Sequence, residues 1–304
     1  MAAGAIDREM LAQVRRIQVR TDRMVTGVLA GGYSSVFRGS GIEFDEVREF
    51  AEGDDLRSVD WNVTARVGRP FIKKFMEERE LTVLFLLDVS ASTGFGTRPP
   101  LARDARSVRE TAALFCGCLA FAAARNNDKA GLIACSDRIE RYVPAKKGRQ
   151  HVLRLIREAY APPRTGRGTD LAQALDFAGR VQRKRAVVFV ISDFFAGEFD
   201  RSLRLLARRH DVIAVRIRDP HSEQLPRAGL LRLYDLETGH ACWVDSSSAR
   251  VRSELAARVA AERAAFAGSC RRARVDLLEV PTRGSVAEPI VRFFRMRELR
   301  GGRR

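Results

Sequence analysis

The chain has 304 residues, of which 45% are hydrophobic and 30% are charged, and its formal net charge is +16. These proportions are typical of an ordinary soluble globular protein. The longest uncharged apolar stretch with a helical pattern, residues 111–124, is too short to cross a bilayer and is excluded as a membrane span. The N-terminus has no basic segment followed by an apolar core, so we expect no signal peptide and a cytoplasmic location.

The first 80 residues differ in character from the rest of the chain. Residues 8–30 carry apolar side chains at helical spacing, which predicts one amphipathic helix or two short ones. Residues 31–80 are rich in glycine and mixed in charge, and they end in the alternating segment Phe71–Met76, which is typical of a strand. The positive charge of the chain lies almost entirely in residues 81–304. We therefore expect residues 1–80 to form a helix and an irregular region that packs on a sheet built from residues 81–304.

From Leu81 onward the sequence predicts alternating strands and helices. We also expect a hairpin from residues 230–236 and 241–244, turning at Thr238 and Gly239. The alternation predicts an α/β fold, a three-layer doubly wound sandwich with a mostly parallel sheet. The strands are expected at residues 81–87, 130–135, 138–144, 186–191, 212–217 and 275–280, and the helices at residues 103–125, 150–159, 170–183, 201–209, 247–272 and 288–299.

The first of these strands is apolar throughout and ends in the carboxylate of Asp88, which is followed by the hydroxyls of Ser90 and Ser92. A strand without polar positions is buried on both faces of its sheet. Open α/β sheets place their ligand sites just beyond the carboxyl ends of such strands. Since carboxylate and hydroxyl oxygens suit a hard cation, these three residues predict a metal site of the magnesium type.

Two further segments carry oxygen donors at the same kind of position. Thr169 lies in a glycine-containing loop that runs into a helix, and Asp193 ends the apolar strand that begins near Val187. Each also has a purely structural interpretation. Thr169 or Asp170 would cap the helix, for which the spacing of Asp170 and Gln173 fits a capping box, and Asp193 would cap the next element.

Taken together and in this order, the five donors resemble the metal-ion-dependent adhesion site of von Willebrand factor A domains. The resemblance implies that the two serines and the threonine contact the metal directly, and that the aspartates reach it directly or through water. It implies Mg²⁺ as the ion, with Mn²⁺ or Ca²⁺ as alternatives, and an acidic side chain of a partner protein at the open coordination position. The residues that match the pattern are Asp88, Ser90, Ser92, Thr169 and Asp193.

A second resemblance rests on the segments Gly41–Phe50 and Gly53–Trp61, on Ala65 and Arg66, and on Phe71–Glu80. They resemble the bacterial family called domain of unknown function 58, von Willebrand factor A-like proteins found beside MoxR-type AAA+ ATPases. Longer members carry membrane helices ahead of these segments, and this chain resembles the short soluble kind. The resemblance implies a partner ATPase of the MoxR type and a client protein that offers an acidic side chain to the metal.

The segment Gly53–Trp61 allows two interpretations. The carboxylates that flank Arg57 would form an intramolecular salt-bridge cluster, with Trp61 filling an apolar seam. The alternative is that these carboxylates, on Asp54, Asp55 and Asp60, bind the ATPase or a second ion.

The sequence thus predicts a non-enzymatic, Mg²⁺-dependent protein-interaction module that acts as an adaptor for a MoxR-type AAA+ ATPase, without a membrane partner. A phosphotransferase of the haloacid dehalogenase type would need an aspartate two residues after Asp88, where the chain has Ser90. The net charge of +16 leaves nucleic-acid binding as the alternative function, although aromatic residues are not interleaved with the basic runs. That alternative predicts binding that falls steeply with salt and does not respond to EDTA.

Overall fold

A computed structural model of the chain describes residues 33, 47–51, 59, 61–73, 80–94, 106–161, 168–195, 197–219, 222 and 224–301. The helix expected at residues 8–30 lies outside the described residues, as does most of the segment Gly53–Trp61. No helix in the described part of the chain combines the length and the apolar character that a membrane span requires.

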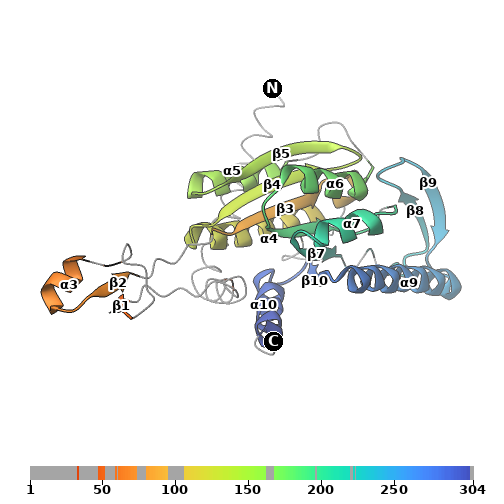
Figure 1. The fold of residues 1–304 in the computed structure, drawn as a ribbon. Coiled ribbons are helices and arrows are strands. Elements are labelled where there is room, and N and C mark those ends of the chain that lie inside the picture. Colours follow the sequence, from red (N-terminus) through yellow and green to blue (C-terminus); the bar gives the residue numbers. More distant parts are fainter. Residues whose placement is uncertain are drawn as a thin grey trace, which may run out of the picture.

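The predicted α/β fold with a mostly parallel sheet is confirmed (Figure 1). All strand pairs in the six-stranded sheet are parallel except β4 and β5, which form an antiparallel hairpin. Each strand lies within two residues of its predicted bounds. In spatial order the strands are β10 (Asp276–Pro281), β7 (Asp211–Arg218), β6 (Val187–Ser192), β3 (Thr82–Asp88), β4 (Lys129–Cys135) and β5 (Ile139–Lys146).

Two helical layers cover the sheet because every strand of its centre is apolar on both faces. In β3 the side chains of Val83, Phe85 and Leu87 belong to one buried cluster, whereas Leu84 and Leu86 belong to another. The first cluster is closed by α4 (Val108–Arg125), α5 (Arg149–Tyr160) and α10 (Ala287–Gly301), and the second by α6 (Leu171–Val181), α7 (Asp200–Ala207) and α9 (Ala249–Ala273).

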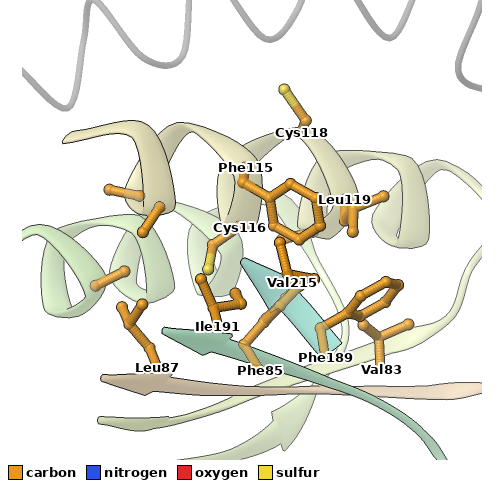
Figure 2. Packing of buried hydrophobic residues seen from close by; sticks show 14 of the residues in the cluster. Val83, Phe85, Leu87, Phe115, Cys116, Cys118, Leu119, Phe189, Ile191 and Val215 are labelled. Atoms are coloured by element: carbon orange, nitrogen blue, oxygen red, sulfur yellow. The ribbon is translucent and has the colours of Figure 1, made fainter. Parts of the chain in front are cut away.

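Figure 2 shows the first cluster between α4 and the central strands. The ring of Phe189 stacks on Phe85 at a centroid distance of 5.9 Å and meets the edge of Phe115 at 5.7 Å. Helix α4 starts at Val108, five residues later than predicted, because Ser107 caps it. The Ser107 hydroxyl accepts a bond from the Glu110 backbone N–H, and the Glu110 carboxylate accepts one from the Ser107 N–H.

The region before the sheet is described only in part. β1 (Val47–Glu49) and β2 (Phe71–Lys73) pair in antiparallel fashion, and α3 (Trp61–Val67) lies between them in sequence. Trp61 is 70% exposed, so it does not fill an apolar seam. Tyr33 is buried, and its hydroxyl donates to Asp128 at 3.0 Å. The predicted division of the chain at residue 80 stays a prediction.

The predicted hairpin near the C-terminal third is also present. β8 (Leu230–Tyr234) and β9 (Ala241–Asp245) form a separate two-stranded antiparallel sheet. Gly239 in its turn has a φ of +76°, a conformation that glycine adopts without steric cost.

Candidate metal site at the carboxyl ends of β3 and β6

The candidate site lies where the order of the strands reverses. From β3 the chain proceeds outward to β4 and β5, then returns to β6 on the other side of β3 and continues to β7. The loops after β3 and β6 therefore run in opposite directions, which is the position of ligand sites in doubly wound sheets. Asp88 is the last residue of β3, and Asp193 directly follows β6.

Asp88 is 2% exposed and is held by hydrogen bonds to both carboxylate oxygens. Oδ1 accepts the backbone N–H of Ser90 at 2.9 Å, and Oδ2 accepts the hydroxyl of Ser192 at 2.7 Å. Burial raises the pKa of Asp88 to about 6, and the charge of Asp193 adds to this rise. Our sequence analysis did not identify Ser192. Its signal is a lone hydroxyl at the end of an otherwise apolar strand.

The two serines lie on a tight turn after β3. Residues Ala91–Gly94 form a short 3₁₀-helix, and the Thr93 hydroxyl closes it by donating to the Ser90 carbonyl at 2.7 Å. The hydroxyl oxygens of Ser90 and Ser92 are 2.9 Å apart. The turn thus brings both hydroxyls to the same side, next to Asp88.

Asp193 is joined to the same group through Ser192, whose hydroxyl oxygen lies 3.5 Å from Asp193 Oδ1 and 2.7 Å from Asp88 Oδ2. Burial raises its pKa, while the backbone N–H of Phe195, which donates at 3.1 Å, partly opposes the rise. The next residue, Phe194, has a φ of +61°, which is strained for a residue with a side chain. Stacking of Phe194 on Phe266 at 4.1 Å supports this conformation and fixes the loop that carries Asp193.

Thr169 lies at the same edge of the sheet but has a different partner. Its loop is held to the end of β4 by a hydrogen bond from the Asp170 N–H to the Ser136 carbonyl. Asp170 caps α6 by accepting the Gln173 N–H at 2.9 Å, so the structural interpretation holds for that residue. The Thr169 hydroxyl donates to Glu237 at 2.9 Å, a contact that our sequence analysis did not foresee.

The structure therefore joins Asp88, Ser90 and Ser92 by direct hydrogen bonds and Asp193 to them through Ser192, and it places the fifth predicted residue at the same edge. Neither Asp88 nor Asp193 forms an ion pair with a described residue. Burial disfavours the charge of Asp88 and of the half-buried Asp193 beside it, and Arg216 offsets this only in part at Asp193. Hydroxyl and carboxylate oxygens are the donors that Mg²⁺ accepts, so the residues present fit this ion. That they bind a metal stays a prediction.

Within the described residues, no three His, Cys, Asp or Glu side chains are placed to share a metal ion. The candidate site differs from such groups because three of its five predicted donors are hydroxyls. An ion held there would keep water or accept a further oxygen from outside.

A cavity of about 290 Å³ opens beside the site. Ser92 and Asp193 line it, and so do residues 234–236 of the β8–β9 hairpin. Arg216 and Arg218 also contribute to its wall. Basic side chains next to the predicted metal ligands make the cavity suitable for an acidic group.

Comparison with known families gives one match that covers most of the chain. The family model described as "Protein of unknown function DUF58" matches residues 46–265. The uncharacterized protein Rv1480 of Mycobacterium tuberculosis is 33% identical over 301 residues, which are 98% of this chain and 93% of that protein. The uncharacterized protein MAV169 of Mycobacterium avium is 35% identical over 158 residues, which are 51% of this chain.

Solved structures are similar at a lower level. The conserved hypothetical protein BatB from Bacteroides thetaiotaomicron aligns with 72% of this chain and 99% of its own, at 17% identity and a TM-score of 0.44. The SpRpn10 VWA domain covers 69% of this chain and 94% of its own, at 12% identity and a TM-score of 0.38. Proximal thread matrix protein 1 from the mussel byssus, "with zinc occupied MIDAS motif", covers 45% of this chain and 38% of its own, at 16% identity and a TM-score of 0.34. Likenesses this distant carry no information about ligands.

Proposed function

Because the chain belongs to the DUF58 family, whose model spans residues 46–265, we propose that it is a non-enzymatic module that binds a partner protein through a divalent cation. The observation that supports this function most strongly is the pair of carboxylates at the reversal point of the sheet, the buried Asp88 and the half-buried Asp193. Both lie against the hydroxyl of Ser192, and neither forms an ion pair with a described residue.

The residues that would hold the ion are the five predicted from the sequence. When bound, Mg²⁺ would supply a positive centre with an open position for an oxygen ligand. The chain's own contribution is to fix the donors: Asp88 through Ser90 and Ser192, and Asp193 through Ser192 and the Phe195 N–H. The rigid turn after β3 lowers the conformational cost of bringing these groups together.

The partner that this chemistry suits is a protein with an exposed carboxylate. The basic wall of the adjacent cavity and the positive charge of residues 81–304 would steer an acidic surface toward the site. On the strength of the family resemblance, the proposed partner is a MoxR-type AAA+ ATPase in the cytoplasm. The chain would act as its adaptor and present a client protein for remodelling or complex maturation.

A non-enzymatic function is supported by the state of the reactive side chains in the described residues. Burial raises the pKa of the Cys116 and Cys135 thiols, so neither forms the thiolate that a nucleophile requires. The His151 ring is engaged with the backbone carbonyl of Ala130 at 3.0 Å. These groups serve packing and local structure.

The proposed function is tested by immobilising the chain and adding the purified MoxR-type ATPase of the same organism, with Mg²⁺ or with EDTA. We expect binding by the wild type with Mg²⁺ only, and none by Asp88→Ala in either buffer. Asp176→Ala removes an exposed carboxylate from α6 and should behave like the wild type. Equal binding by wild type and Asp88→Ala in both buffers would contradict the proposal. Retention of nucleic acid that falls with salt and ignores EDTA would support the alternative function instead.

A further inference from the structure

The carboxylate of Glu237 contacts Thr169, one of the predicted metal ligands, although the two residues are 68 positions apart in the sequence. Its Oε1 accepts the Thr169 hydroxyl at 2.9 Å. Its Oε2 is 3.8 Å from the position that a Cβ would take at Gly168. The acidic group thus sits directly against the loop that carries one of the predicted ligands.

The tip of the β8–β9 hairpin is built to hold Glu237 in this place. The Asp235 carboxylate accepts the backbone N–H of Glu237 at 2.9 Å and the hydroxyl of Thr238 at 2.6 Å. The Gly239 N–H closes the turn on the Asp235 carbonyl at 2.8 Å. Because the turn is ordered by its own hydrogen bonds, Glu237 projects from a preformed tip.

The rest of the hairpin is only lightly attached to the domain. β8 and β9 pair with each other and not with the six-stranded sheet. At the base, the Ser246 N–H and hydroxyl both donate to the Gly229 carbonyl, at 2.8 and 2.7 Å. Along the exposed face, Leu230 and Trp243 are each 64% exposed. Since an isolated two-stranded ribbon is marginally stable, contacts at its tip have a large share in fixing its position.

The hairpin also forms one wall of the cavity beside the site. Tyr234, Asp235 and Leu236 line that cavity together with Ser92 and Asp193. A side chain that approaches the predicted metal ligands through this cavity must pass the hairpin tip.

We propose that the β8–β9 hairpin is a lid over the cavity beside the predicted metal site, that the bond between Glu237 and Thr169 holds it closed, and that a partner's carboxylate must displace it. This inference rests on the proposed function, because it assumes a cation at Asp88 and Asp193. The lid makes binding conditional: a partner gains access only if its acidic side chain competes with Glu237. A weakly acidic protein is thereby rejected even where the cation is bound.

The test uses Mn²⁺ as the ion and water-proton relaxation as the readout, because a carboxylate that joins the ion displaces relaxing water. The probe is the peptide acetyl-Gly-Asp-Gly-amide, and acetyl-Gly-Asn-Gly-amide is its uncharged match. We compare the wild type with Glu237→Gln, which keeps the shape but removes the charge. Glu254→Gln, at an exposed ion pair with Arg250 on α9, is the matched control for the loss of one carboxylate.

We expect Glu237→Gln to bind the aspartate peptide about tenfold more tightly than the wild type, since the competing charged hydrogen bond is lost. Its Mn²⁺ complex should also show a higher relaxation enhancement before peptide is added. Asp235→Asn, which weakens the hydrogen bonds of the hairpin tip, should raise both the peptide affinity and the relaxation enhancement, but by a smaller amount. Glu254→Gln should match the wild type.

Equal peptide affinities in the wild type and Glu237→Gln, with Mn²⁺ bound to both, would overturn the lid while leaving the metal site intact. In that event Glu237 only orients the Thr169 hydroxyl. Failure of the wild type to bind Mn²⁺ would instead overturn the proposed function, and the lid with it.

Discussion

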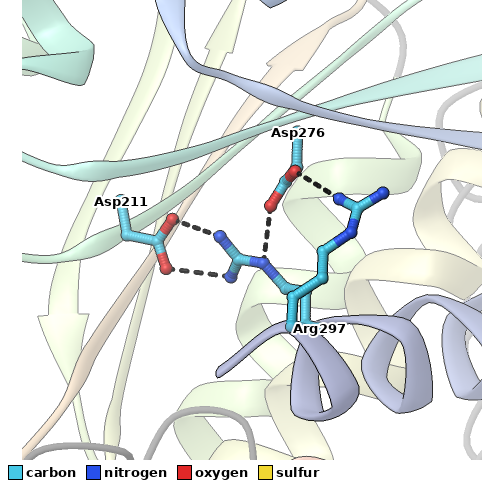
Figure 3. Close-up of polar contacts among 4 residues, drawn as sticks. Asp211, Asp276 and Arg297 are labelled. Carbon is cyan, nitrogen blue, oxygen red and sulfur yellow. Dashed lines mark hydrogen bonds and ion pairs between the residues drawn. The ribbon is translucent and has the colours of Figure 1, made fainter. Parts of the chain in front are cut away.

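Two pairs of carboxylates lie at opposite ends of the same sheet, and they differ in the partners that the chain gives them. At the amino ends of β7 and β10, Asp211 and Asp276 share the guanidinium of Arg297 from α10 (Figure 3). Arg297 donates to both oxygens of Asp211, at 2.9 and 2.6 Å, and to Asp276 at 2.7 Å. At the carboxyl ends of β3 and β6, Asp88 and Asp193 have only hydroxyl and backbone donors.

The difference separates a structural contact from a candidate functional one. Arg297 completes the charge balance of its carboxylates within the chain, and these carboxylates in turn raise its pKa. The pair at the other end keeps a raised pKa, because burial disfavours its charge and no described basic residue forms an ion pair with it. A divalent cation from solution would balance the charge of Asp88 and Asp193, as Arg297 balances the charge of Asp211 and Asp276.

The largest effect is expected from removing one carboxylate at each end. Asp88→Ala should lower the affinity for Mn²⁺ by at least about 100-fold, because the loss of a direct ligand exceeds the roughly 10- to 100-fold effect of an outer-shell partner. Asp276→Ala should leave Mn²⁺ affinity unchanged and lower stability instead. Isothermal titration with Mn²⁺ measures the first quantity and urea unfolding the second. Equal Mn²⁺ affinity in Asp88→Ala and the wild type would show that the carboxylates at the two ends of the sheet do not differ in metal binding.

Removal of the internal cation comes next in size. Arg297→Met should destabilise the fold by about 2 kcal/mol, since it removes three charge-assisted hydrogen bonds from two half-buried carboxylates. Arg300→Met is the matched control: Arg300 is exposed and reaches Asp276 only at 3.5 Å, so its loss should cost less than about 0.5 kcal/mol. Urea unfolding of both variants gives the free energies. A result in which both variants unfold like the wild type would show that α10 does not depend on this contact.

The response to pH should distinguish the candidate site from the structural contact. In the metal-free chain the pKa of Asp88 is raised from 3.8 to about 6, so the folded state binds this proton more tightly than the unfolded state. Its contribution to metal-free stability is therefore fully present below pH 3.8 and is lost as the pH rises through 6. Metal binding needs the deprotonated form, so Mn²⁺ affinity should fall about tenfold for each pH unit below 6. Titrations at pH 5, 6 and 7.5 test this, and an affinity constant across that range would contradict it.

The smallest effect concerns the turn that carries the serines. Thr93→Val keeps the shape of the buried side chain but removes its bond to the Ser90 carbonyl, and should cost about 1 kcal/mol of stability. Because the turn then holds Ser90 and Ser92 less firmly, Mn²⁺ affinity should also fall. Thr282→Val, at a buried hydroxyl that has no hydrogen-bond partner among the described residues, should not destabilise the chain and should leave metal affinity unchanged. Comparing the two variants by thermal unfolding and Mn²⁺ titration shows whether the turn contributes to metal affinity.

Much of the fold could be predicted because its elements are encoded locally. The continuous apolar runs at residues 81–87 and 186–191 predicted buried parallel strands, and the structure has β3 and β6 there. Asp88 and Asp193 could be placed at one edge because parallel strands end together. The predicted start of α4 at residue 103 was wrong. The capping box of Ser107 and Glu110 fixes where this helix begins, and hydrophobic periodicity carries no information about caps.

The contacts that define the surroundings of the site could not be predicted in this way. The bond between Thr169 and Glu237 joins loops from distant parts of the chain, and so does the contact of Arg297 with Asp211. Neither residue of such a pair has a local pattern that marks it, because the pairing depends on how a hairpin or a helix docks on the sheet. The role of Ser192 has a weak local signal, but its partner Asp88 is 104 residues away.

The most direct test of the central claim is the anomalous diffraction of a crystal of the chain grown with Mn²⁺ at pH 7.5. We predict one strong anomalous peak between Asp88, Ser90, Ser92 and Asp193, and its disappearance in crystals of Asp88→Ala. A well-ordered site without a peak at saturating Mn²⁺ would contradict the claim that these carboxylates hold an external cation.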